Sequence, residues 1–115
     1  MEIIPDKWVV IGITKKGQTV YKIFGSWAGG YLDGDSWKLN SGIESLTEDE
    51  HNYYFKGYSG SVYKCNKNHY GVATSYSQSV LENFQRVALE GNMKITIFEE
   101  NNWKQQIDNH GKEEN

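Results

Sequence analysis

The fold is decided by residues 7–14, which read Lys-Trp-Val-Val-Ile-Gly-Ile-Thr. This pattern predicts a β-strand that is apolar on both of its faces. Residues 15–18 follow as a turn in which Gly17 can adopt a positive φ. The side chains of residues 19–24 then alternate between the two faces of a second strand. The sequence therefore predicts a β-hairpin at the start of the domain.

Turn-forming residues recur every eight to twelve positions beyond the hairpin, which is typical of an antiparallel meander. The segment 25–35 is expected to be a glycine-rich loop that carries aromatic side chains. Further strands are predicted at residues 36–40, 43–47, 53–57, 61–65 and 69–73.

One helix is predicted, over residues 79–90. Ser79 and Glu82 match a capping box at its start, and Gly91 marks its end. A final strand is expected over residues 93–98. The predicted fold class is therefore α+β: an antiparallel meander sheet of six to seven strands, with the helix at about 79–90 packed on one face. Residues 1–107 are expected to form one domain, and 108–115 a flexible tail.

Composition excludes several function classes. The chain has 115 residues and a formal net charge of −3, and Arg86 is its only arginine beside eleven lysines. Arginine supplies the bidentate contacts to phosphate and guanine, so direct nucleic-acid binding is not expected. No apolar run is long enough to cross a bilayer, so no membrane association is expected. The single cysteine, Cys65, favours a reducing, cytoplasmic compartment.

The sequence contains no recognisable catalytic, metal or cofactor motif. Residues 57–61 read Gly-Tyr-Ser-Gly-Ser, which approaches a nucleophile elbow but joins two predicted strands. Cys65 could form a thiol–imidazole pair with His51 or His69, although nothing in the sequence places them together. The segment Asp33-Gly34-Asp35 lacks the further ligands of a calcium loop. We therefore expect no cofactor, and a hydrolase is the least favoured class.

Two features favour a binding surface. The first is a group of aromatic residues on or beside glycine-rich turns, a common setting for interface anchors. These residues could instead form a small core beneath the loop, and Trp37, on a strand, is the one most expected to be buried. The second is an acidic ridge formed by Glu44, Glu48, Asp49 and Glu50, which could attract a basic partner or could be a solvated turn. The candidate partner-binding residues are Trp27, Tyr31, Asp33, Asp35, Trp37, Glu48, Asp49, Glu50 and Tyr58.

These observations favour a non-catalytic module that binds another protein with a basic or mixed surface. Inhibitors of this type include phage-encoded anti-defence proteins and toxin-immunity proteins. Asn, Lys, Ile and Tyr make up about a third of the chain, and this bias towards AT-rich codons agrees with a mobile element. The alternative is a protein that sequesters a small, nucleotide-like molecule between its Trp and Tyr rings. A homodimer is compatible with both interpretations.

Overall fold

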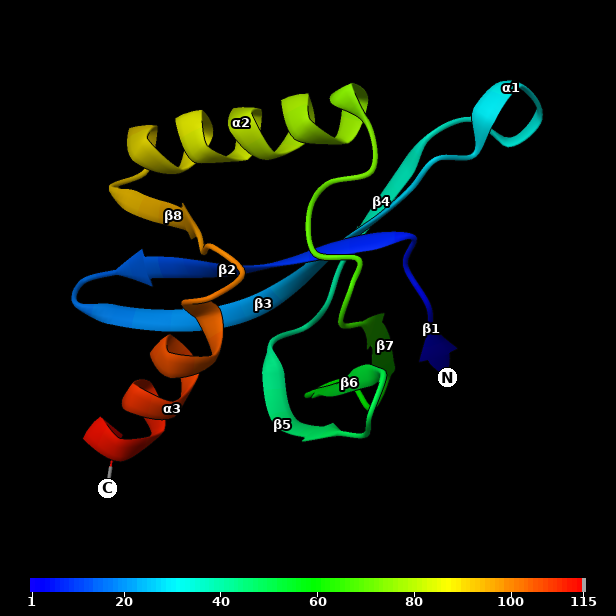
Figure 1. Ribbon diagram of the computed structural model, residues 1–115. Helices are drawn as coiled ribbons and strands as arrows, with labels where there is room; N and C mark the ends of the chain where they lie inside the picture. The colour runs from blue at the N-terminus through cyan, green and yellow to red at the C-terminus, as the bar shows by residue number, and fades with distance from the viewer. Residues whose placement is uncertain (115) are drawn as a thin grey trace.

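The strands form two four-stranded sheets, and one long helix covers a face of one of them (Figure 1). The computed structural model describes residues 1–114, apart from the side chains of Tyr31 and of residues 109–114. The predicted α+β class, with its principal helix in the C-terminal half, is confirmed. The strands are divided between two sheets, however, and do not form one meander.

The opening hairpin is confirmed. Strand β2 (Lys7–Lys15) pairs antiparallel with β3 (Gln18–Trp27), and Lys15 lies opposite Gln18. The two-residue turn between them has positive φ at both positions, 53° at Lys16 and 78° at Gly17. This is the turn geometry whose twist matches that of two paired strands.

The hairpin forms the centre of the first sheet, in the order β4-β3-β2-β8. Strand β4 (Ser36–Leu39) pairs with the end of β3, and β8 (Met93–Ile97) pairs with β2. Helix α2 (Ser75–Glu90) lies across one face of this sheet (Figure 1). There Leu81 packs against side chains that β2 and β3 direct to that face, including Val9, Ile11 and Phe24.

The opposite face of the hairpin packs on the second sheet, in the order β1-β7-β6-β5. Its strands are β1 (Glu2–Ile3), β5 (Ile43–Glu48), β6 (Asn52–Gly57) and β7 (Val62–Asn66). Strand β1 runs parallel to β7, a pairing that the sequence did not predict.

The core between the two sheets is aromatic. Trp8 of β2 makes edge-to-face contacts with Trp103 and Tyr53 and a tilted contact with Phe55, at centroid distances of 5.5 to 5.7 Å. Trp103 begins helix α3 (Trp103–Glu114) and is almost completely buried. Aromatic packing thus joins the hairpin, the second sheet and the C-terminal helix.

The strand predicted at residues 69–73 is wrong. Only Tyr70 bridges to β2, opposite Trp8. Its hydroxyl accepts a hydrogen bond from the Val10 N–H (3.0 Å) and donates one to the Phe98 carbonyl (2.6 Å). The side chain of Tyr70 therefore satisfies backbone groups where β8 leaves β2.

Helix α2 begins four residues earlier than the predicted capping box. Thr74 is the N-cap, and its side-chain oxygen accepts a hydrogen bond from the Ser77 N–H. The Ser79 hydroxyl, the predicted cap, instead donates to the Ser75 carbonyl one turn back (3.0 Å). Ser77 is buried beside β4, so tertiary packing extends the helix into a serine-rich segment of modest helix propensity. The predicted end at Gly91 is confirmed.

Two other segments carry more regular structure than the sequence predicted. The glycine-rich loop is shorter, because β3 continues through Trp27 and a single helical turn, α1 (Gly30–Asp33), follows. Helix α3 runs through most of the predicted tail, to Glu114, and position 115 lies outside the described residues. Flexibility of the segment 108–115 stays a prediction.

The Tyr70 hydroxyl gives the first testable prediction. Removing it in a Tyr70→Phe variant leaves the Val10 N–H and the Phe98 carbonyl without this partner inside the protein. We expect the free energy of unfolding to fall by about 1–3 kcal/mol, measured by urea denaturation. The control is Tyr58→Phe, because the Tyr58 ring is exposed and its hydroxyl forms no hydrogen bond with the described residues. Equal stability of Tyr70→Phe and wild type would contradict this role.

Candidate binding surface

The two tryptophans of the predicted aromatic group lie on opposite faces of the first sheet. Trp37 pairs with Ser26, the residue next to Trp27, and neighbouring residues of a strand point to opposite sides. Trp37 stacks on Phe24 beneath α2, with a centroid distance of 5.7 Å and an interplanar angle of 11°. Trp27 is half-buried on the other face, where its indole N–H donates to the Ile4 carbonyl (2.9 Å). The two rings therefore pack on opposite faces of the sheet and do not stack on each other.

Of the other two aromatic candidates, the structure describes the side chain of Tyr58 alone. Tyr58 lies in the turn between β6 and β7 and is 69% exposed, beside Gly42 and Val20. The side chain of Tyr31, in α1, lies outside the described residues. The sequence therefore identified aromatic residues on turns, but the topology distributes them over separate parts of the molecule.

A groove lies where β3 and β4 leave the body of the protein. Its volume is about 560 Å³, and Trp27, Asp33 and Trp37 contribute to its lining, so it joins three of the predicted residues. Asp6, which precedes β2, and Lys38 of β4 supply further charges. We call this site the β3–β4 groove; its lining residues are Asp6, Trp27, Ala28, Gly29, Asp33, Gly34, Ser36, Trp37 and Lys38.

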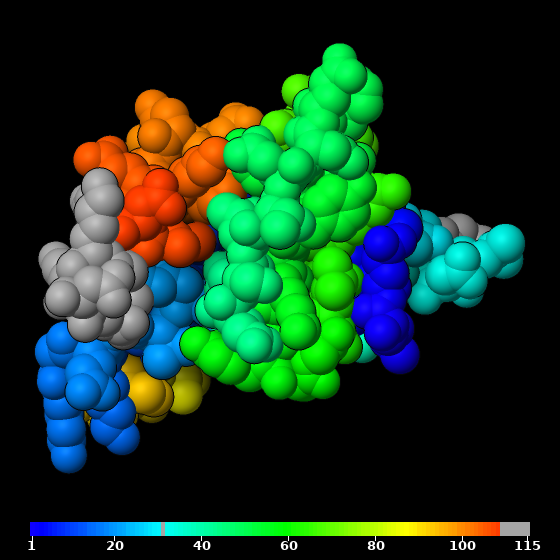
Figure 2. Space-filling view, turned by 90° about the horizontal axis from the view of Figure 1, so that it is seen from below, coloured from blue at the N-terminus to red at the C-terminus, as the bar shows by residue number. Residues whose placement is uncertain are grey.

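Beyond the groove, residues 28–35 form an arm that projects away from the body of the protein (Figures 1 and 2). The chain turns back on itself so closely that a Cβ atom at Gly29 would lie 1.7 Å from the Gly34 carbonyl oxygen. Glycine is therefore required at position 29. Leu32 at the tip is 89% exposed, the highest value among the large apolar side chains that the structure describes.

Sequence reasoning missed Leu32. A single leucine in a loop is an ordinary surface residue, and only the projection of the arm makes it prominent. Asp33 and Asp35 are exposed beside it, as expected for a solvated turn. Neither forms an ion pair or a side-chain hydrogen bond with the described residues. Among the described side chains of the arm, one large apolar side chain is therefore exposed close in sequence to two free carboxylates.

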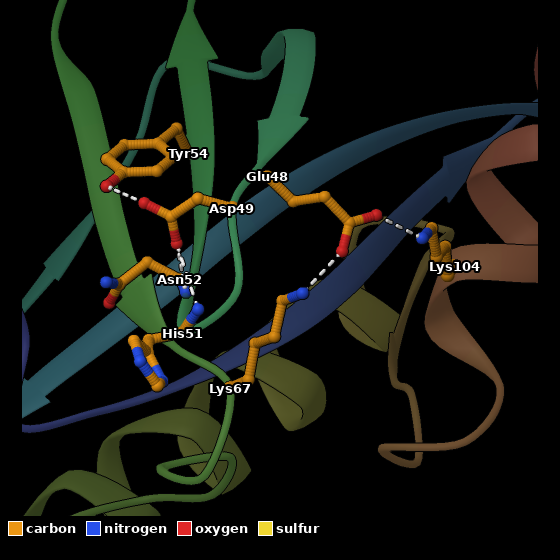
Figure 3. Close-up of polar contacts among 7 residues, drawn as sticks. All are labelled: Glu48, Asp49, His51, Asn52, Tyr54, Lys67 and Lys104. Atoms are coloured by element: carbon orange, nitrogen blue, oxygen red, sulfur yellow. Dashed lines mark hydrogen bonds and ion pairs between the residues drawn. The ribbon is translucent and has the colours of Figure 1, made fainter.

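The acidic ridge at the β5–β6 turn is used largely within the protein (Figure 3). Glu48 accepts hydrogen bonds from Lys104 (2.7 Å) and Lys67 (2.6 Å), so it connects the first turn of α3 to the segment after β7. These two lysines lower the pKa of the Glu48 carboxyl. Within the predicted ridge, Glu48 therefore has its charge offset by two neighbouring lysines.

Asp49 holds the β5–β6 turn in shape. One carboxylate oxygen accepts from the backbone N–H groups of His51 and Asn52, and the other accepts from the Tyr54 hydroxyl (2.7 Å). The Tyr54 hydrogen bond is the largest cause of a lowered Asp49 pKa, followed by the two backbone bonds. Glu50 remains exposed, with the His51 imidazole 3.8 Å from its carboxylate. Glu44, the fourth residue of the ridge, is also exposed.

The residues considered for catalysis do not contact one another in the described part of the chain. Cys65 is fully buried, and burial raises the pKa of its thiol, which disfavours the nucleophilic thiolate. The Ser59 hydroxyl pairs with that of Ser41 (3.2 Å). Neither His51 nor His69 forms a side-chain hydrogen bond with a described serine or with Cys65.

In the part of the chain that the structure describes, no group of three or more His, Cys, Asp or Glu side chains is arranged to hold a metal ion. No helix of this part of the chain is both long and apolar enough to cross a membrane.

Comparison of the chain with models of protein families, with curated proteins and with solved structures finds no match. The candidate surface must therefore be interpreted from its own geometry and chemistry.

The lowered pKa values at the β5–β6 turn predict a pH dependence. A carboxylate whose pKa is lower in the folded than in the unfolded chain stabilises the fold above its unfolded-state pKa. This stabilisation is lost as the pH falls through the folded-state pKa. For Glu48 and Asp49 the loss begins near their ordinary values, 4.5 and 3.8, and continues below them.

We therefore expect a Glu48→Gln/Asp49→Asn double variant to be less stable than the wild type at neutral pH. The difference should narrow as the pH falls from about 5 to 3, measured by thermal unfolding across this range. The amide side chains keep an oxygen acceptor, so the turn geometry is preserved. Glu50→Gln is the matched control and should follow the wild type. A difference that stays constant with pH would contradict the assignment.

Proposed function

We propose that this protein is a non-catalytic module that binds another protein through the β3–β4 arm and thereby occludes a functional surface of that partner. The observation that carries the proposal is the arm itself, which stands away from the body and holds Leu32 almost completely in solvent. An exposed leucine at the tip of a projecting turn is suited to insertion into an apolar pocket of another protein.

The charges around the arm indicate the kind of partner. Asp33 and Asp35 follow the leucine closely in the chain and are free of ion pairs within the described residues. Carboxylates at the rim of an interface speed encounter with a basic surface and disfavour acidic ones. The proposed partner therefore has an apolar pocket with a basic or mixed rim. Small size and a sequence biased towards AT-rich codons support an inhibitor or neutraliser carried by a mobile element, directed at a defence enzyme or a toxin.

The arm can be tested by quantitative affinity capture from the native host followed by mass spectrometry. Leu32→Asp should reduce recovery of a stoichiometric partner about tenfold or more, the effect of removing one central anchor. Leu89→Asp is the matched control, because Leu89 is also exposed (66%) but lies at the far end of α2. A second variant, Gly29→Ala, changes the arm's backbone and should also lose the partner.

Two outcomes would count against the proposal. One is the absence of any stoichiometric protein partner with the wild type. The other is equal recovery with Leu32→Asp and Leu89→Asp, since a nonspecific apolar contact would be affected by both changes alike. Circular dichroism of each variant separates loss of binding from loss of fold.

The β3–β4 groove favours a second candidate function, the sequestering of a small nucleotide-like molecule. A groove of about 560 Å³ that contains a tryptophan and a lysine could hold a base and a phosphate. For this function, thermal-shift measurements against nucleotides and cyclic dinucleotides should show a clear rise in melting temperature. Under the protein-binding proposal we expect no rise in melting temperature with any nucleotide. A rise that Lys38→Gln abolishes would favour the second function.

A further inference from the structure

We infer that the β3–β4 groove receives an arginine side chain of the partner, an inference that rests on the proposed function. The arm supplies an apolar contact through Leu32, and the groove lies directly at its base. A partner that covers the arm would therefore also cover the groove. The chemistry of the groove determines which side chain of the partner fits there.

The aromatic part of the groove is held in place before any ligand binds. The Trp27 indole N–H donates to the Ile4 carbonyl (2.9 Å), and the ring packs beside the aromatic core between the sheets. A fixed ring loses little conformational entropy on binding. Tryptophan is also the side chain that attracts cations most strongly over its face, and a planar guanidinium can stack on it.

The charged part of the groove favours a cation. Among the described lining residues, Asp6 and Asp33 carry negative charges, and Lys38 is the one cationic side chain. Asp6 uses Oδ2 to accept the Ala28 N–H (2.9 Å), and its Oδ1 forms no hydrogen bond with the described residues. Neither Asp33 nor Lys38 forms an ion pair with a described residue. Two carboxylates against one ammonium make a positively charged ligand the better match.

Arginine fits this arrangement better than lysine. Its guanidinium presents five N–H donors in one plane, which can meet carboxylates at its edge while its face lies on an indole ring. A lysine ammonium is a compact and strongly hydrated charge that gains less from stacking. The groove also has room for the residues on either side of an arginine, because about 560 Å³ exceeds the volume of one side chain.

The inference can be tested with purified protein alone. We propose to titrate ¹⁵N-labelled protein with the tripeptide acetyl-Gly-Arg-Gly-amide at about 150 mM salt, where charges beyond roughly 8 Å are screened. Chemical-shift changes should concentrate on the backbone amides of Ala28, Gly29 and Gly34 and on the Trp27 indole N–H. A single arginine without the rest of an interface should bind with a dissociation constant on the order of millimolar. The same peptide with lysine should bind more weakly, and with glutamate it should cause no localised shifts.

Removing a negative charge and removing a positive charge from the groove should change its affinity for the arginine peptide in opposite directions. Asp33→Asn should weaken binding of the arginine peptide about two- to fivefold, whereas Lys38→Gln should tighten it by a similar factor. Asp108→Asn is the matched control, because it removes the same charge from an exposed aspartate of α3 that does not line the groove. Its affinity for the peptide should equal that of the wild type.

Tighter peptide binding by Asp33→Asn and weaker binding by Lys38→Gln, together with preference for the glutamate peptide, would overturn the inference in favour of an anionic ligand. Absence of localised shifts with the arginine peptide would also overturn it. Because no partner protein is present, this result is independent of the capture experiment. If partner capture depends on Leu32 but the arginine peptide does not bind, the proposed function stands and only the inference about the groove is overturned.

Discussion

Burial of β2 on both of its faces is the constraint on which the rest of the structure depends. Trp8 and Val10 point into the core between the two sheets, while Val9 and Ile11 point into the core beneath α2. At roughly 1.5–3 kcal/mol for each fully buried large apolar side chain, neither face can be left in water. The chain must therefore cover both faces of this strand. This explains why a protein of 115 residues builds three layers around a single hairpin.

Each covering layer is attached by side chains from distant parts of the sequence. Tyr70, in the segment between β7 and α2, connects β2 with the end of β8 through its hydroxyl. Burial raises the pKa of this hydroxyl to about 12, so it remains protonated and able to donate. Trp103 and Lys104 attach α3, the first through the aromatic core and the second through Glu48. These attachments use several of the aromatic residues and the carboxylate of Glu48. What remains exposed is therefore a better guide to binding than composition is.

This division changes the interpretation of the candidate residues. Trp37, Glu48 and Asp49 serve packing and turn geometry, whereas Asp33, Asp35 and the outward part of Trp27 remain available near one projecting arm. The proposed binding surface is thus smaller than the sequence suggested, and it gains Leu32. A compact site that combines an apolar tip with an acidic base is consistent with recognition of a folded partner by insertion.

The sequence by itself determined the hairpin, its turn, the end of the long helix and the α+β class. These depend on local chemistry: alternation along a strand, positive φ at Gly17 and the helix-terminating Gly91. Only the tertiary structure decided that the strands divide into two sheets, that α2 begins at Ser75, and that Trp27 and Trp37 lie on opposite faces. Those outcomes depend on contacts between residues far apart in the chain, such as Tyr70 with Val10 and Ser77 with Ser36. Periodicity within one segment carries no information about which distant segment will cover it.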